Sequence, residues 1–184
     1  MARDGWVAER AREFDQLRGQ KIAAWTGVEM ALREETAAGG PQFEDPAVPC
    51  LQLLILGASL DDGTFVTIDT YQDDITWGLW RRRAASDYSA DWAGMTGIYR
   101  MRTLSGLPTG EVDGVSTFLD EGVLAEVVLH IQGQSLLLMA GELYEYPQER
   151  LVFKRCDESV LVFTEPSAAE SVDWVPERRE LAQG

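Results

Sequence analysis

The sequence has few of the residues that most often carry chemistry in proteins, and it is short of positive charge. Its 184 residues include one histidine and two cysteines, and 31 acidic residues outnumber 16 basic ones. The net charge of -15 disfavours binding to a nucleic-acid backbone or to an anionic membrane surface, because both require a basic surface. Apolar runs also stay far below the roughly 20 residues of a membrane-spanning helix. We therefore expect neither nucleic acid nor a membrane as a partner.

A secretory signal peptide is not apparent either. Trp6 and Val7 are the only large apolar residues near the start, so the apolar core of such a peptide is missing. This absence favours a cytoplasmic protein. In a reducing compartment we expect Cys50 and Cys156 to remain free thiols, and neither has a Cys-x-x-Cys partner.

Motifs that mark enzymes and cofactor sites are missing as well. His130 has no cysteine or second histidine near it, so a zinc site is not expected. The chain contains neither a Gly-x-Ser-x-Gly nucleophile motif nor a glycine-rich phosphate-binding loop. Adjacent acids occur mostly at predicted turns, where aspartate is favoured for its hydrogen bonds to the local backbone. We predict a protein that is not an enzyme and has no metal or cofactor.

The residues that are present indicate a globular chain rich in β-structure. Its length and its apolar fraction of 45% fit a single domain spanning residues 1–184. Apolar residues recur at helical spacing from Val7 to Leu17, which predicts a helix over residues 4–18. Alternating or strongly apolar segments then predict strands at residues 22–32, 51–60, 65–71, 75–82 and 98–103. Asp62-Gly63, between two of these strands, predicts a hairpin with a type I′ turn.

A turn at residues 105–110, rich in glycine, divides the chain into two similar halves. After it, strands are predicted at residues 124–131, 136–139, 151–153 and 160–163. Their order repeats that of the first half and suggests an internal duplication. We predict an α+β protein that is predominantly antiparallel β, with an N-terminal helix packed on two β-meander units that form a sandwich or open barrel. The units span residues 1–104 and 105–166, and a C-terminal tail spans residues 167–184.

The acidic residues are concentrated in two parts of the chain. No lysine or arginine occurs between Arg33 and Arg81, where nine acids lie, or between Arg102 and Arg150, where eight acids lie. These two stretches of 47 residues each carry a combined charge of -17, and the rest of the chain carries +2. Each stretch overlies one predicted β unit. The charge can serve solubility alone, or it can form a surface that meets a basic partner.

The segment at residues 71–80 combines aromatic and acidic side chains and is the best candidate for a binding surface. If Ile75 and Leu79 point inward, Trp80 lies on the opposite face, where an aromatic residue ringed by acids can anchor a protein partner. The predicted partner-binding residues are the acids of this region and that tryptophan: Asp61, Asp62, Asp69, Asp73, Asp74 and Trp80. The alternative is that the N-terminal helix covers this face, with Trp6 and Phe14 packed on it.

Two functions fit these features. The first is an acidic, non-catalytic binding protein, an inhibitor that occludes a basic protein partner such as a nuclease toxin after electrostatic steering. In size, acidity and lack of catalytic motifs the chain is similar to the small acidic immunity proteins with which bacteria block such toxins, although no motif carries the likeness. The alternative is a β-rich domain that binds a small ligand, or an enzyme with an unrecognised site, in a cavity edged by Tyr88, Trp92 or His130.

Overall fold

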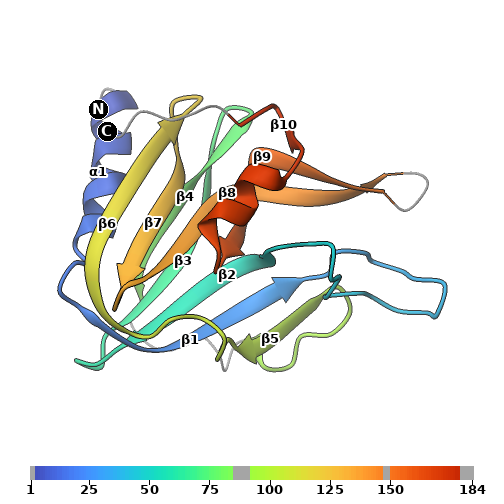
Figure 1. The fold of residues 1–184 in the computed structure, drawn as a ribbon, viewed down its shortest axis with the longest axis horizontal. Helices are drawn as coiled ribbons and strands as arrows, with labels where there is room; N and C mark the ends of the chain where they lie inside the picture. Colours follow the sequence, from blue (N-terminus) through green and yellow to red (C-terminus); the bar gives the residue numbers. More distant parts are fainter. Residues whose placement is uncertain (1–2, 85–91, 147–149, 179–184) are drawn as a thin grey trace.

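The computed structural model of the chain describes residues 3–84, 92–146 and 150–178 (Figure 1). No helix within these ranges is long and apolar enough to cross a membrane. In chain order the elements are α1 (Arg3–Asp15), β1 (Lys21–Met30), β2 (Leu51–Leu60), β3 (Phe65–Asp73), β4 (Thr76–Ala84), β5 (Tyr99–Thr103), β6 (Gly110–Asp120), β7 (Val123–Ile131), β8 (Gln134–Tyr146), β9 (Arg150–Phe163), the 3-10 helix η1 (Pro166–Ser171) and β10 (Trp174–Val175).

The strands of the described residues form one sheet built from two meanders. In the first, β1 to β4 each pair antiparallel with the next strand, and β6 to β9 do the same in the second. The two meanders join where β1 pairs with β6, and β5 adds to the same edge of β1. The prediction of a predominantly antiparallel protein with an N-terminal helix on two meander units is therefore confirmed.

The sheet curls so that strands far apart in the chain meet. One edge of β2 pairs with β1, and residues 51–53 on its other edge pair with residues 160–162 of β9. β1, β2, β9, β8, β7 and β6 thus pair in a closed ring. The β3–β4 hairpin extends from the rest of β2 and packs across β7 and β9. Strand alternation indicates which side of each strand is buried, but it carries no information about this closure.

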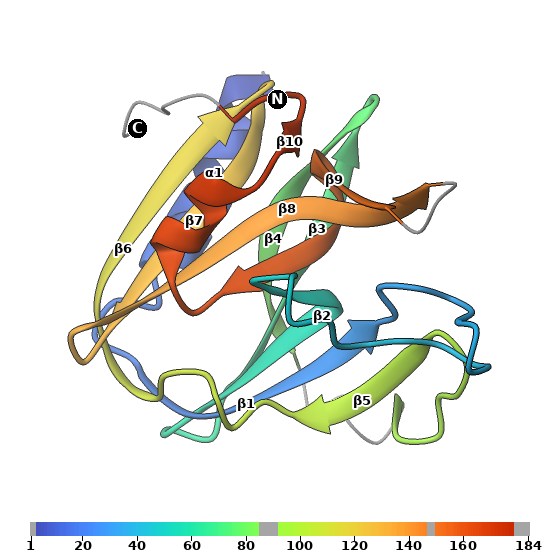
Figure 2. The same ribbon diagram turned by 45° about the vertical axis from the view of Figure 1, so that its right-hand side comes forward.

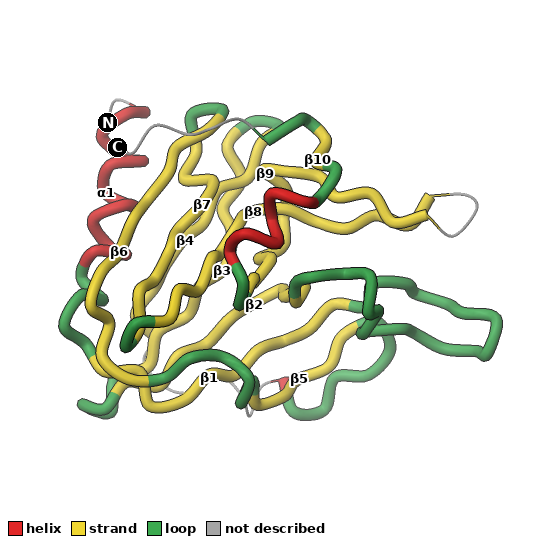
Figure 3. The backbone as a smooth tube through the Cα atoms, viewed as in Figure 1, coloured by secondary structure: helices red, strands yellow, loops and turns green. Residues whose placement is uncertain are grey.

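Two apolar clusters occupy opposite faces of the curled sheet. Leu136 and Leu138 of β8 belong to the main cluster inside the ring, whereas Leu137 belongs to a second cluster on the outer face, because successive side chains of a strand point to opposite faces. The segment that contains η1 and β10 covers this outer cluster (Figure 3), and Trp174 stands edge-on to Phe153 at 5.6 Å between ring centroids. The C-terminal segment is thereby fixed against the sheet.

Helix α1 packs on the sheet through a short apolar stripe. Phe14 and Leu17, the latter in the turn that follows the helix, are buried in the main cluster, and Trp6 stands edge-on to Tyr71 of β3 at 4.3 Å between ring centroids. The predicted helix over residues 4–18 is confirmed apart from its ends. The helix spans Arg3–Asp15, so it begins one residue earlier than predicted and ends three residues earlier.

Three local predictions are wrong. Ile75 does not point inward: it lies in the β3–β4 turn and is 84% exposed, because β4 begins only at Thr76. The segments at residues 151–153 and 160–163 are parts of one strand, β9, whose pairing with β8 is interrupted by a β-bulge. The hairpin between β2 and β3 is confirmed, but of its two central residues only Gly63 has a positive φ, 81°, so the turn is not type I′.

Candidate functional site

The acids predicted to bind a partner lie towards opposite ends of β3. Asp61 and Asp62 belong to the turn before this strand, whereas Asp73 ends the strand and Asp74 follows it. At about 3.4 Å for each residue, the nine residues of β3 place these two turns about 30 Å apart. The structure therefore divides the predicted site into two acidic turns, with Asp69 on the strand between them.

The acids of the first turn and of the strand engage neighbouring groups of the fold. The Asp61 carboxylate lies 3.2 Å from the Nζ atom of Lys21. Asp62 accepts a hydrogen bond of 2.8 Å from the backbone N–H two residues ahead, and this bond lowers the pKa of Asp62. Asp69 forms an ion pair with Arg82 of β4. Asp62 and Asp69 thus make their contacts within β2–β4 and the turns between them, whereas Asp61 pairs with β1.

Trp80 lies under the N-terminal helix. Its ring centroid is 6.1 Å from that of Trp6, and the guanidinium groups of Arg10 and Arg82 lie 5.0 Å and 4.9 Å from the Trp80 ring. The tryptophan is half-buried by these contacts. The arrangement matches the alternative in which the helix covers this face, although Phe14 packs into the main cluster instead.

The β3–β4 turn presents both charge and apolar surface to solvent. Ile75 and its neighbour Asp74 are both exposed. The side-chain amide of Gln72 donates a hydrogen bond of 3.0 Å to the Asp74 carbonyl, and the Thr76 hydroxyl donates one of 2.9 Å to the Asp73 carbonyl. These bonds define the shape of the turn, so Ile75 is displayed on a structured tip.

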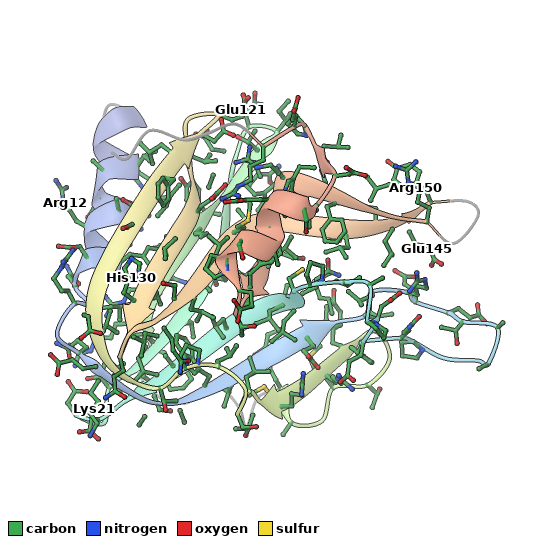
Figure 4. The ribbon with its side chains drawn as sticks, viewed as in Figure 1. Arg12, Lys21, Glu121, His130, Glu145 and Arg150 are labelled. Atoms are coloured by element: carbon green, nitrogen blue, oxygen red, sulfur yellow. The ribbon has the colours of Figure 1, made fainter. Side chains whose placement is uncertain are left out.

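A second acidic turn, between β6 and β7, lies at the same end of the molecule (Figures 1 and 2). It carries Leu119, which is 46% exposed, and then Asp120 and Glu121, the latter labelled in Figure 4. The two turns are linked below their tips, because the Tyr71 hydroxyl of β3 accepts a hydrogen bond of 3.3 Å from the backbone N–H of Leu124 in β7.

We call this surface the acidic end and define it as residues 73–75 of the β3–β4 turn and residues 119–121 at the β6–β7 turn. Each of the two stretches without basic residues contributes one of its turns. Of the predicted partner-binding residues, the structure places only Asp73 and Asp74 here. Sequence reasoning missed Glu121, although an acid followed by glycine at a hairpin tip was a usable signal.

A buried ion network supports the acidic end from below. Arg155 lies 2.7 Å from Asp120 and 3.1 Å from Glu126, and Arg178 lies 2.7 Å from Glu126. Glu126 is only 2% exposed, so two guanidinium groups offset the cost of burying its charge. These four residues come from β6, β7, β9 and the segment after β10, and no spacing in the sequence relates them.

A groove of about 1060 Å³ lies between the outer face of β6–β8 and the C-terminal segment. Phe118, Val128 and Leu137 line it from the strands, and Glu170 and Asp173 line it from the opposite wall. Its base contains Glu126, whose charge is already matched by arginines. An apolar floor beneath an acidic wall suits a small ligand that has an apolar body and a positive charge.

A buried carboxyl group lies beside the β8–β9 bulge. Glu142 is 8% exposed and accepts a hydrogen bond of 3.2 Å from the Ser159 hydroxyl. Burial raises the pKa of Glu142 to about 7, and the nearby charges of Glu158 and Asp157 act in the same direction. The Asp157 carboxylate is itself paired with the Lys154 ammonium at 2.7 Å. Glu142 can therefore gain or lose a proton near neutral pH.

Two of the residues proposed to edge a ligand cavity, Trp92 and His130, lie in different surroundings. Trp92 packs with Val28 and Phe65 in an apolar cluster, whereas His130 is exposed on β7 with its Nδ1 atom 3.0 Å from the Ser135 hydroxyl. Tyr88 lies outside the described residues. In the part of the chain that the structure describes, no three histidine, cysteine or acidic side chains are placed to hold a metal ion.

The two cysteines are free thiols, as expected. Cys50 packs against the outer apolar cluster, and Cys156 belongs to another cluster that includes Tyr71. Burial raises the pKa of Cys50 to about 12 and that of Cys156 to about 11. Because the thiolate is the reactive form, neither thiol is activated as a nucleophile at neutral pH.

Comparison of the chain with protein-family models, with curated proteins and with solved structures gave no match.

Proposed function

We propose that this chain is a non-catalytic binding protein, an inhibitor of the immunity type, which acts in the cytoplasm and occludes a basic protein partner with its acidic end. One observation carries the proposal. Exposed Ile75 and Leu119 lie beside the acids of two separate turns at one end of the fold. That combination offers a protein partner both charge and apolar area.

The two kinds of side chain have different tasks in this proposal. The acids raise the rate of encounter with a basic surface, and this effect weakens as salt screens the charges. The apolar side chains then provide contact area from which water is excluded. Structured turns favour binding because little conformational entropy is lost when they dock.

Paired charge reversals test the proposal. The wild-type chain is used to capture its partner from the native host, and association with the purified partner is then measured by surface plasmon resonance. The double variant Asp74→Lys/Glu121→Lys should slow association by about tenfold at physiological salt, because it replaces attraction with repulsion. The control, Glu111→Lys/Asp113→Lys, reverses two exposed acids near the start of β6 and changes the net charge equally.

The expected control result is a loss of less than about twofold, since screening confines charge effects to about 8 Å at physiological salt. The proposal fails if the partner is not basic, if association does not depend on salt, or if both double variants slow association equally.

The groove favours a second candidate function, the binding of a small cationic ligand. Val128→Trp would fill the groove, whereas the acidic end would keep its side chains. If Val128→Trp abolishes the activity that is found for the protein and the charge reversals at residues 74 and 121 leave it intact, the groove is the functional site.

A further inference from the structure

A basic cleft lies between α1 and β4, on a protein whose net charge is -15. It has a volume of about 600 Å³. Four arginines line it against two glutamates: Arg12, Arg81, Arg82 and Arg83 against Glu9 and Glu13, together with Gln16 and Trp80. The local charge is therefore opposite in sign to that of the whole molecule.

Three of these four guanidinium groups lack a close ion pair among the described residues. Arg82 is paired with Asp69, but Arg12, Arg81 and Arg83 form no ion pair with any residue that the structure describes. Arg81 donates to the Gln16 side-chain oxygen at 3.1 Å. Arg83 donates to the Thr64 hydroxyl at 3.3 Å. Glu13 and Asp62 attract Arg81 and Arg83 without forming a close ion pair, so part of the positive charge stays available to an anion.

One donor in the cleft is both buried and unsatisfied. The Nε atom of Arg81 is inaccessible to solvent and has no hydrogen-bond partner among the described residues. A buried donor without a partner costs free energy, and burial also lowers the pKa of Arg81. A rotation of the Arg81 side chain on binding would turn this donor towards an anionic oxygen and relieve both costs. The Glu13 carboxylate on the opposite wall is paired with Arg10 at 2.9 Å, so it opposes the anion less than a free carboxylate would.

We propose that this cleft binds a compact oxyanion of the phosphate type, held by Arg12, Arg81 and Arg83. The planar guanidinium fork matches the oxygens of phosphate. A compact anion is favoured over a long polyanion because charges beyond about 8 Å are screened at physiological salt, and the excess of arginine is confined to this cleft on a molecule with a net charge of -15. The site is independent of the acidic end and of the function proposed for it.

Titration of the full-length protein with inorganic pyrophosphate tests the site, with isothermal calorimetry as the readout. We expect saturable binding at one site, weakened about tenfold by Arg12→Gln or Arg83→Gln, since each removes a charge-assisted contact. Both side chains are exposed, so folding is not at risk. Arg150→Gln is the control: Arg150 is exposed on the β8–β9 arm, away from Arg12 (Figure 4), and its removal changes the net charge by the same amount.

Arg81→Lys separates charge from geometry, because lysine keeps the charge and lacks the Nε–H donor. It should weaken pyrophosphate binding, and the Nε–H resonance of wild-type Arg81 should shift in NMR spectra during the titration. Absence of saturable binding at millimolar pyrophosphate overturns the proposal. Equal weakening by Arg12→Gln and Arg150→Gln also overturns it, because that result would show a general charge effect.

Discussion

Two buried glutamates of this protein have different neighbours, and those neighbours determine the cost of burying each carboxylate. Glu142 lies beside the β8–β9 bulge with the Ser159 hydroxyl as its hydrogen-bond donor, and Glu126 lies between two arginines. Pairing with arginine stabilises the buried carboxylate of Glu126. Burial instead raises the pKa of Glu142 to about 7. Neither outcome follows from the sequence, where both are single acids within apolar strands.

Glu142→Gln should make the protein more stable above neutral pH. Because the folded state keeps the Glu142 proton up to about pH 7 and the ordinary value is 4.5, the folded state binds more protons between these values. The free energy of unfolding contributed by this group therefore falls as pH rises from 4.5 to 7. This loss in the free energy of unfolding corresponds to about 3 kcal/mol. Glutamine is uncharged at every pH, so the variant does not undergo the loss.

Urea unfolding at pH 4.5 and at pH 8 measures this effect. The variant should gain stability over wild type only at the higher pH. Glu145→Gln, at an exposed position of the same strand, should show a much smaller change. A variant that is less stable than wild type at pH 8 would contradict the assignment of a buried, unfavourable charge.

At the scale of elements, hairpins were predictable and the irregularities between them were not. The turn at Asp62-Gly63 was recognisable because glycine readily adopts a positive φ, which is 81° at Gly63. The bulge in β9 gave no such signal: Cys156, with φ of 52°, is not a residue type typical of that conformation. After the bulge, residues 160–162 of β9 pair with β8 on one edge and with β2 on the other.

Gly141→Ala should destabilise this junction by about 1–3 kcal/mol, the usual cost of overpacking. A Cβ atom at Gly141 would lie 2.7 Å from the backbone carbonyl oxygen of Lys154, and backbone cannot rotate out of the way as a side chain can. Gly106→Ala is the matched control, since a Cβ atom there meets nothing within 4 Å. Thermal or urea denaturation compares the two variants, and equal stability would refute the close approach.

For the whole molecule, the distribution of charge matters more than its sum. Arginines from distant parts of the chain neutralise several acids: Arg100 and Arg102 of β5 both pair with Glu29 of β1. The acids that remain exposed include Asp74 and Glu121 of the acidic end, and the α1–β4 cleft keeps a surplus of arginine. One chain can therefore present an acidic docking surface and a basic cleft.

Added salt should raise the melting temperature of the free protein. The excess of 31 acids over 16 basic residues makes self-repulsion the dominant long-range term, and raising salt from about 0.01 M to about 0.15 M shortens the screening length from about 30 Å to about 8 Å. We expect an increase of a few degrees, about 2–4 °C for each kcal/mol gained. A melting temperature that falls, measured by differential scanning calorimetry, would mean that screening of the ion pairs dominates.

The sequence alone determined the class of this protein: apolar alternation and turn residues specify an N-terminal helix and two antiparallel meanders, because these signals act over a few neighbouring residues. Only the tertiary structure decided which charges meet. The pairing of β2 with β9 and of β1 with β6 joins residues about one hundred positions apart. That closure brings Asp74 and Glu121 to one end, leaves Asp61 and Asp62 at another, and places Trp80 under the helix. Such contacts depend on how the whole sheet curls, which no local pattern encodes.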